Sequence, residues 1–475
     1  MSESKIQYNR AKNWEVVLFA TKDVVPNVFL FLMNFVSYLA TGNYGILVSV
    51  AGIIVTASRI FDGITDPIIG LVVDKTNGRF GRFRPMMVIG YIIIAISLFL
   101  MYFVGIGSGV VVFTIIYAVY IIGYTFFTTA SNGARSVLTN EPKQRASNGR
   151  WTGIFVILLS TAFSSVYTSQ YLIPKHSGVN LAALQEMCIT AIIIGGVFTI
   201  LACIAIASKD KPEYYSNLSS SSVSLKDIFT TLKGNRPLQM MIVAASSDKL
   251  AMQTTANSSV GIMVFGIIVG NYTFRSNLSL WVLIPTILMI FFGMSFASKL
   301  GFKKATVFSA WGAIITSIIQ FLLFRIAPTQ IGVNIGVTAL FIISYSLTSG
   351  FKQIGTSCVP PMMSDIADYE MYRTGKFIPG MVSAVYSFVD KVISSLAATI
   401  VALLLSMIGF TDVLPQPSDA YTEPIFWLSM FIFIGMPMIG WLCTIVAMKY
   451  YTLDPEKMKE IQMTNAERKA ADKAV

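Results

Sequence analysis

Long apolar runs separated by short polar connections dominate this chain. An α-helix needs about 20 such residues to cross the hydrocarbon core of a bilayer. The first run follows the polar residues 1–15 and lacks a small-residue cleavage motif, which predicts a retained span and not a signal peptide. The runs predict twelve spans, at residues 16–41, 44–73, 86–105, 109–138, 151–173, 184–207, 237–269, 276–298, 302–327, 333–363, 379–409 and 424–448.

A polar, Ser-rich stretch at 208–236, containing SNLSSSSVS, separates the sixth predicted span from the seventh. Such a composition is typical of a linker. We therefore predict a six-helix bundle over 1–207, a linker over 208–236, a second six-helix bundle over 237–448 and a polar tail over 449–475.

Composition agrees with a polytopic membrane protein. Of the 475 residues, 54% are apolar and only 12% are charged, which is not the composition of a soluble globular domain. The net charge of +11 would suggest a nucleic-acid partner if the basic residues formed one stripe, but they recur in short clusters between apolar runs. This pattern indicates a lipid bilayer and no nucleic acid as partner. A single histidine and four scattered cysteines do not provide a His/Cys metal cluster.

Loop charge predicts the orientation, because Lys and Arg are retained on the cytoplasmic side. The even-numbered connections are rich in basic residues, whereas the odd-numbered ones hold little more than Lys175, Arg275 and Arg325. Both termini should therefore be cytoplasmic. Two pseudo-symmetric sets of six helices joined by a cytoplasmic linker predict an all-α major facilitator fold, in which the substrate binds between the halves. The sequence shows no nucleophile paired with a base, so it does not indicate an enzyme. The charge pairs of spans one and seven favour a carrier over a channel.

Ionisable residues inside the predicted spans are candidate functional groups, because charge in a bilayer is costly. Span one holds Lys22 and Asp23, span seven holds Asp248 and Lys249, span ten holds Lys352, and span eleven holds Asp390 and Lys391. For Asp248 and Lys249, mutual neutralisation within the span is as good an interpretation as function.

Arg59, Asp62 and Asp66 follow i, i+3, i+7 spacing in span two, so they share one helical face. Two carboxylates facing a cavity would bind Na⁺ through oxygen ligands, or hold a proton because repulsion and desolvation favour protonation of one of them. A purely structural Arg–Asp network is the alternative. The pattern favours a coupling-ion site.

Span four carries uncharged polar residues one turn apart, Tyr124, Thr128 and Asn132, beside Thr125. Singly, such groups often only join helices, but together they suit a polyhydroxylated ligand. The basic connection DKTNGRFGRFRP at 74–85 contains Arg79, Arg82 and Arg84. We expect it to anchor the chain on the cytoplasmic side and to lock a gate through ion pairs with neighbouring helix ends.

RIFDGITDPIIGLVVDKTNGRFGRFRP at 59–85 closely resembles the signature of the glycoside-pentoside-hexuronide:cation symporter family, the melibiose permease-like branch of the major facilitator superfamily. TKDVVPN at 21–27 resembles its first-helix motif, and the segment from Pro360 to Lys391 resembles its tenth-to-eleventh-helix motif, which includes Asp365 and Asp368 as gate or structural residues. The resemblance implies a bacterial inner-membrane symporter without cofactors, driven by Na⁺, H⁺ or Li⁺.

By the same resemblance, Asp62, Asp66 and Thr125 match cation-binding positions. Positions of the substrate site are matched by Lys22, Asp23, Tyr124 and Lys391, and by Arg150 at a shorter spacing from Arg145. Thr128 and Asn132 depart from melibiose permease, which has an Asp and a Trp there.

The substrate class stays open. Thr128 replaces a carboxylate of melibiose permease, and Lys352 and Lys249 add positive charge, which favours a glucuronide or another anionic glycoside as substrate. A neutral glycoside or pentoside is equally compatible with the sequence. The alternatives are transport of a non-sugar organic solute and H⁺-coupled export. A cytoplasmic phosphotransferase regulator is a further candidate partner.

Overall fold

The computed structural model describes residues 9–76, 78–139, 141–211, 232–374 and 379–472. Within these ranges the chain is helical, with no strand beyond an isolated bridge between Gly78 and Gly81. It divides into two compact units, the first comprising Met1–Ser220 with Phe410–Leu414 and the second Ser221–Gly409 with Pro415–Val475. Each unit is described by itself below.

Unit 1 contains the six predicted spans of the N-terminal half. Its helices are α1 (Asn13–Phe19), η1 (Ala20–Asp23), α2 (Val24–Met33), α3 (Val36–Tyr44), α4 (Val48–Lys75), α5 (Phe83–Phe99), η2 (Leu100–Val104), α6 (Gly109–Leu138), α7 (Pro142–Thr161), η3 (Ala162–Leu172), α8 (Ile173–Lys175) and α9 (Leu181–Ile206). The first predicted span tightens to a 3₁₀ turn at η1, where the charged pair Lys22 and Asp23 lies.

Unit 2 contains the spans of the C-terminal half. Its helices are α11 (Arg236–Ala256), α12 (Ser258–Gly261), η5 (Ile262–Ile268), α13 (Tyr272–Leu300), α14 (Phe302–Ile326), η6 (Pro328–Gln330), α15 (Ile335–Thr374), α16 (Pro379–Met407), α17 (Glu423–Met430), η7 (Phe431–Gly435), α18 (Met436–Tyr450) and α19 (Pro455–Asp472). The predicted polar tail therefore holds a helix, α19.

Ten helices of the described chain are long and apolar enough to cross a membrane. The two remaining predicted spans, 237–269 and 276–298, are helical as well, so the helices are consistent with twelve spans. The first of them is interrupted at Asn257, and only its second part, Ser258–Ile268, is apolar. The polar part, α11, contains Asp248 and Lys249.

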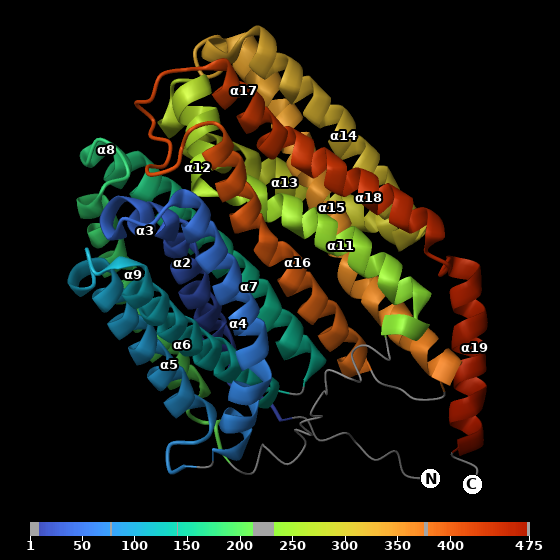
Figure 1. Cartoon of the computed structure of the whole chain (residues 1–475). Helices are drawn as coiled ribbons and strands as arrows, with labels where there is room; N and C mark the ends of the chain where they lie inside the picture. The colour runs from blue at the N-terminus through green and yellow to red at the C-terminus, as the bar shows by residue number, and fades with distance from the viewer. Residues whose placement is uncertain (1–8, 77, 140, 212–231, 375–378, 473–475) are drawn as a thin grey trace. The chain divides into compact units, whose positions relative to one another are not determined.

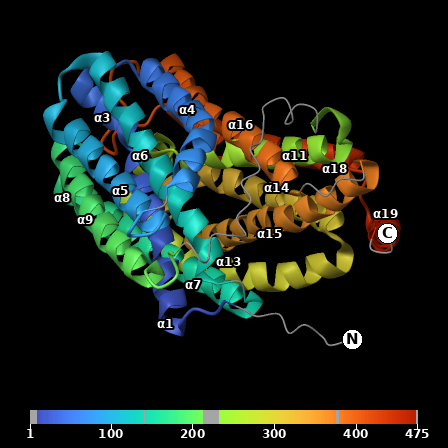
Figure 2. The ribbon, with the colours of Figure 1, turned by 90° about the horizontal axis from the view of Figure 1, so that it is seen from below.

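Close backbone packing joins α5 to α6, which run side by side in both views (Figure 1 and Figure 2). A Cβ atom at Gly90 of α5 would lie 2.6 Å from the backbone nitrogen of Phe127 in α6. Only glycine leaves room for this approach. The packing fixes the position of α6, which also contacts α4.

The turn before α5 is held by Asp210, a buried carboxylate in the stretch that we predicted as linker. Its Oδ1 accepts from the backbone nitrogen of Arg82 at 3.0 Å, and its Oδ2 accepts from those of Phe83 at 3.1 Å and Arg84 at 2.9 Å. The Nε of Arg84 lies 3.4 Å from Oδ2. Asp210 thus caps the N-terminus of α5, where a negative charge is favourable. Gly81, with a φ of +90°, packs against it.

In unit 2, the turn before α14 is held in a related way. Gly301 has a φ of +88° and packs against Pro455, the first residue of α19. The Nζ of Lys303 donates to the carbonyl oxygen of Tyr451 at 2.6 Å. Along α19, Asn465 donates to the carbonyl oxygen of Asp368 in α15 at 2.9 Å, and Ile461 is buried. The tail helix is therefore packed on α15.

Replacing Asp210 by alanine should lower the free energy of unfolding by about 2 to 4 kcal/mol, because three buried backbone N–H groups lose their acceptor. Asp210→Asn keeps one acceptor oxygen, so its free energy of unfolding should lie between those of the unmodified protein and Asp210→Ala. Thermal unfolding of the purified protein in detergent measures the effect. Asp412→Ala, which removes an exposed carboxylate of the same unit, is the matched control and should change stability by less than about 0.5 kcal/mol. Equal stability of the two alanine variants would contradict the capping role.

Candidate functional site: polar clusters in the two helical units

Two of the predicted cation ligands meet between α4 and α6. The hydroxyl of Thr125 donates to Oδ1 of Asp62 at 2.6 Å. The same hydroxyl lies 3.0 Å from the carbonyl oxygen of Ile121, one turn earlier in α6. Thr125 is fully buried and Asp62 is half-buried. The Thr125 hydroxyl therefore contacts both a carboxylate and a backbone carbonyl oxygen. All three groups are potential ligands of a small hard cation.

Arg59 and Asp66, the other members of the predicted face, also lie on α4. Asp66 lies one turn beyond Asp62 on α4 and is half-buried. Arg59 interacts electrostatically with Tyr117 and Tyr120 of α6, and Asp62 interacts with Tyr117. Arg59 and Asp62 of α4 are thus directed at α6, as expected for charges kept from lipid.

Within the predicted polar stripe of α6, Thr128 is bonded to the backbone of its own helix. The hydroxyl of Thr128 lies 2.9 Å from the carbonyl oxygen of Tyr124 and 3.3 Å from that of Thr125. The Tyr124 ring centroid lies 6.2 Å from that of Tyr120. With its proton directed to the backbone, Thr128 presents acceptor lone pairs to any neighbouring ligand.

A second polar cluster joins η1, α6 and α7. Lys22, which is fully buried, bonds through Nζ to Oδ1 of Asp23 at 2.8 Å and to Oδ1 of Asn132 at 3.4 Å. The other Asp23 oxygen pairs with Arg135 and accepts from the Thr152 hydroxyl at 3.3 Å. Three predicted substrate-site residues, Lys22, Asp23 and Asn132, are therefore brought together.

Arg135 and Thr152 were not predicted as members of this cluster. Arg135 follows Asn132 by three residues, so i, i+3 spacing on the polar face of α6 was the signal that could have identified it. Thr152 carried no signal, because its contact with Asp23 spans 129 residues of sequence. Arg150, predicted for this site, lies on α7 with its side chain outside the described part of the chain.

In unit 2, the charged residues of α11 pair with two other helices. Lys249 forms an ion pair with Asp390 of α16. Asp248 interacts electrostatically with Lys352 of α15 and forms a hydrogen bond with Trp441 of α18. The interpretation that Asp248 and Lys249 neutralise each other is therefore wrong. Consecutive residues of a helix point about 100° apart, so each reaches a different neighbour.

The pair of Lys249 and Asp390 is unequally exposed. The side chain of Lys249 is 44% exposed and that of Asp390 only 4%. Among the described residues, Oδ1 of Asp390 has no hydrogen-bond partner. Because a lysine ammonium is too costly to face lipid near the middle of a span, this side of α11 must adjoin polar space.

The remaining predicted residues lie farther along α15 and α16. Asp365 interacts electrostatically with Asp368 and with Tyr451, close to where α19 packs, and Lys391 follows Asp390 on α16. Prediction missed Glu370, which is buried. It accepts from Nδ2 of Asn235 at 2.8 Å and pairs with Arg373 at 2.8 Å, so it ties the start of α11 to α15.

Removing one partner of the Lys249–Asp390 pair should destabilise the protein more than removing both. Lys249→Met leaves the Asp390 carboxylate buried without its cation, which should cost about 3 kcal/mol, whereas Lys249→Met/Asp390→Leu should recover most of that loss. Unfolding in detergent measures the single and double variants. If the double variant loses the sum of the two single losses, the pair is not energetically coupled.

Comparison with known proteins identifies the family. A family model described as MFS/sugar transport protein matches residues 19–455. The chain is 23% identical over 446 residues to the putative glycoside/cation symporter YagG of Escherichia coli (strain K12), covering 92% of this chain and 91% of that protein. It is 22% identical over 468 residues to the glucuronide carrier protein homolog of the same organism, covering 97% of each.

Solved structures show the same fold. The crystal structure of nucleoside transporter NupG superposes with a TM-score of 0.62 at 12% identity, covering 93% of this chain and 100% of that one. At this identity the likeness concerns the fold alone. Together with the ten apolar helices, these matches show that the chain belongs to the MFS/sugar transport protein family and is a multi-pass membrane transporter, not an enzyme.

Proposed function

We propose that this protein is a cation-coupled sugar symporter, which imports a glycoside or a hexuronide together with Na⁺ or H⁺ by alternating access. The names of its relatives, a glycoside/cation symporter and a glucuronide carrier homolog, support this class. The residues 1–207 and 237–448 would form its two moving halves.

The hydrogen bond between Thr125 and Asp62 is the observation that carries the coupling-ion assignment. The hydroxyl of Thr125 has one proton and lies within bonding distance of two acceptors, the Asp62 carboxylate and the Ile121 carbonyl. A bound Na⁺ would be held by both Asp62 and the hydroxyl oxygen, leaving the hydroxyl proton for Ile121. Protonated Asp62 would donate to Thr125 and leave the same proton for Ile121. Either coupling ion therefore satisfies all three groups at once.

The charge of the Lys22 cluster supports an anionic substrate. Its described side chains carry two cations, Lys22 and Arg135, against the single carboxylate of Asp23. The lysines on which the sequence argument relied are compensated instead, since Lys249 pairs with Asp390 and Lys352 interacts with Asp248. A uronate carboxylate would bind at the excess positive charge, while sugar hydroxyls would donate to Asp23.

Orientation and partners complete the proposal. The likeness to bacterial symporters supports a bacterial inner membrane, and the basic even-numbered connections favour cytoplasmic positions for both termini. The turn before α5 and the tail helix α19 would then lie on the cytoplasmic side, where a phosphotransferase-type regulator would dock.

Thr125→Val should weaken the apparent affinity for the coupling ion about fivefold to tenfold, because it removes one ligand and keeps the side-chain shape. Asp62→Asn should abolish accumulation driven by an ion gradient. Uptake of labelled glycosides and glucuronides into proteoliposomes, with an inward Na⁺ or H⁺ gradient, measures both. Thr114→Val is the matched control, since that exposed hydroxyl of α6 bonds only its own helix backbone, to Val110. Gradient-driven accumulation by Asp62→Asn would refute the assignment. Absence of any sugar uptake by the unmodified protein would favour a non-sugar solute or export.

Arg135→Gln should reduce uptake of an acidic glycoside about tenfold more than uptake of its neutral counterpart, because it removes the excess positive charge beside Asp23. Lys352→Ala, which removes a compensated lysine, should reduce both to a similar extent. Equal losses for both substrates in Arg135→Gln would remove the argument for an anionic substrate and leave a neutral glycoside.

A further inference from the structure

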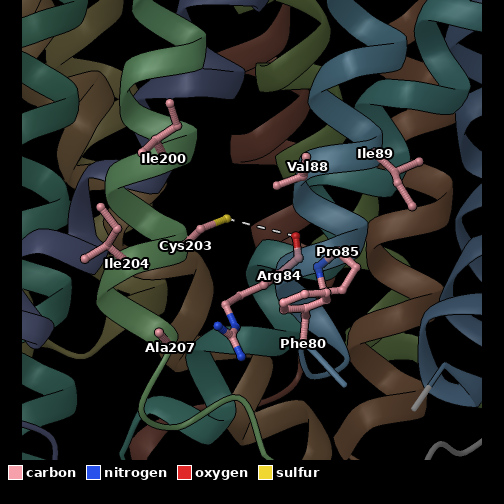
Figure 3. Close-up of a pocket in the computed structure, with 9 residues that line it drawn as sticks. All are labelled: Phe80, Arg84, Pro85, Val88, Ile89, Ile200, Cys203, Ile204 and Ala207. Carbon is pink, nitrogen blue, oxygen red and sulfur yellow. Dashed lines mark hydrogen bonds between the residues drawn. The ribbon is translucent and has the colours of Figure 1, made fainter. Parts of the chain in front are cut away.

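A pocket of about 570 Å³ opens between α5 and α9 in unit 1 (Figure 3). Its walls are formed by Val88 and Ile89 on α5 and by Ile200, Cys203 and Ile204 on α9. Apart from Arg84, every side chain that lines it is apolar or a thiol. None of the residues of the clusters described above lines it, so it is separate from the proposed transport site.

The pocket lies on an exposed apolar surface of unit 1. Both helices are long and apolar enough to cross a membrane, and the side chains of Ile200 and Ile204 are 62% and 51% exposed. Apolar side chains exposed on such helices face lipid tails. What distinguishes this position from an ordinary lipid-facing surface is the volume of the pocket, together with the charge at one end.

The charged end lies at the start of α5. Figure 3 shows the guanidinium of Arg84 between Ala207 of the α9 end and Phe80. Its Nε meets Asp210, and Arg79, Arg82, Lys209 and Lys211 belong to the same two chain segments. Five cations thus accompany one carboxylate that is already occupied by backbone N–H groups. This excess of positive charge on the two chain segments favours an anionic group near Arg84.

We propose that this pocket is a binding site for an anionic glycerophospholipid, with an acyl chain between α5 and α9 and the headgroup phosphate on Arg84. An apolar wall that ends in a basic cluster at the membrane surface matches the two parts of such a lipid. A fatty acyl chain alone would contact the apolar wall but not the basic residues. A soluble phosphate would bind the basic residues but not the apolar wall. The lipid would bridge the two elements that Asp210 also joins, the start of α5 and the end of α9.

Cys203 provides a direct test, because its thiol lines the pocket and Cys443 of α18 lies elsewhere with similar partial exposure. The full chain is placed in nanodiscs of phosphatidylcholine with increasing phosphatidylglycerol, and modification of both thiols by N-ethylmaleimide is followed by peptide mass spectrometry. Phosphatidylglycerol should slow the modification of Cys203 and leave that of Cys443 unchanged. In Arg84→Gln, about fivefold more phosphatidylglycerol should be needed for the same protection. Equal modification rates with and without phosphatidylglycerol, or protection unaffected by Arg84→Gln, would overturn the proposal.

Arg84→Gln could disturb folding by removing the contact with Asp210, so a second variant tests the site through its apolar wall. Ile204→Trp fills the apolar wall, and Ile193→Trp, on an exposed position of α9 outside the pocket, is its matched control. Native mass spectrometry should find less phosphatidylglycerol retained by Ile204→Trp than by Ile193→Trp or the unmodified protein. Equal retention in all three would refute the site, and neither outcome depends on the transported substrate.

Discussion

The cost of placing charge inside a bilayer is the constraint on which the organisation of this protein depends. An ionisable side chain in a span must be paired or must adjoin polar space. Unit 1 meets this requirement with Asp23, which holds Lys22 on one oxygen and Arg135 on the other. Unit 2 meets it with two interactions that radiate from adjacent residues, Lys249 to Asp390 and Asp248 to Lys352. In both units these charge contacts therefore join different helices of the unit.

The same constraint explains what the sequence could predict. Apolar runs and loop charge are local signals, so the helices, their order and the fold class followed from them. Helical periodicity is local too: it placed Arg59 and Asp62 on one face of α4, and both interact with α6. Ion-pair partners across helices are not local. Arg135 meets Asp23 over 112 residues and Lys249 meets Asp390 over 141. Helical spacing could place Arg135 on the polar face of α6, but it could not reveal either pairing. Adjacency in the chain wrongly suggested that Asp248 and Lys249 neutralise each other.

The turns that precede α5 and α14 show that one geometry can be stabilised by different chemistry. Each turn contains a glycine at positive φ, Gly81 or Gly301, packed against the chain that follows the last span of its unit. In unit 1 a carboxylate, Asp210, accepts from backbone N–H groups, whereas in unit 2 a lysine, Lys303, donates to a backbone carbonyl. Both turns require a positive φ and close packing against a neighbouring residue, and glycine permits both. The polar partner differs between the two turns, a carboxylate in unit 1 and an ammonium in unit 2.

Within unit 1, α6 is the element that connects the proposed coupling-ion site to the proposed substrate cluster. Thr125 contacts Asp62 on α4, while Asn132 and Arg135 contact Lys22 and Asp23 on η1. Seven residues separate Thr125 from Asn132, about 10 Å along a helix, so the two groups of contacts are distinct but share one rigid element. A ligand that fixes α6 against α4 also restricts its position relative to η1. If the cation and the sugar each favour the same placement of α6, each raises the affinity for the other by the same factor, and the coupling requires no direct contact between them.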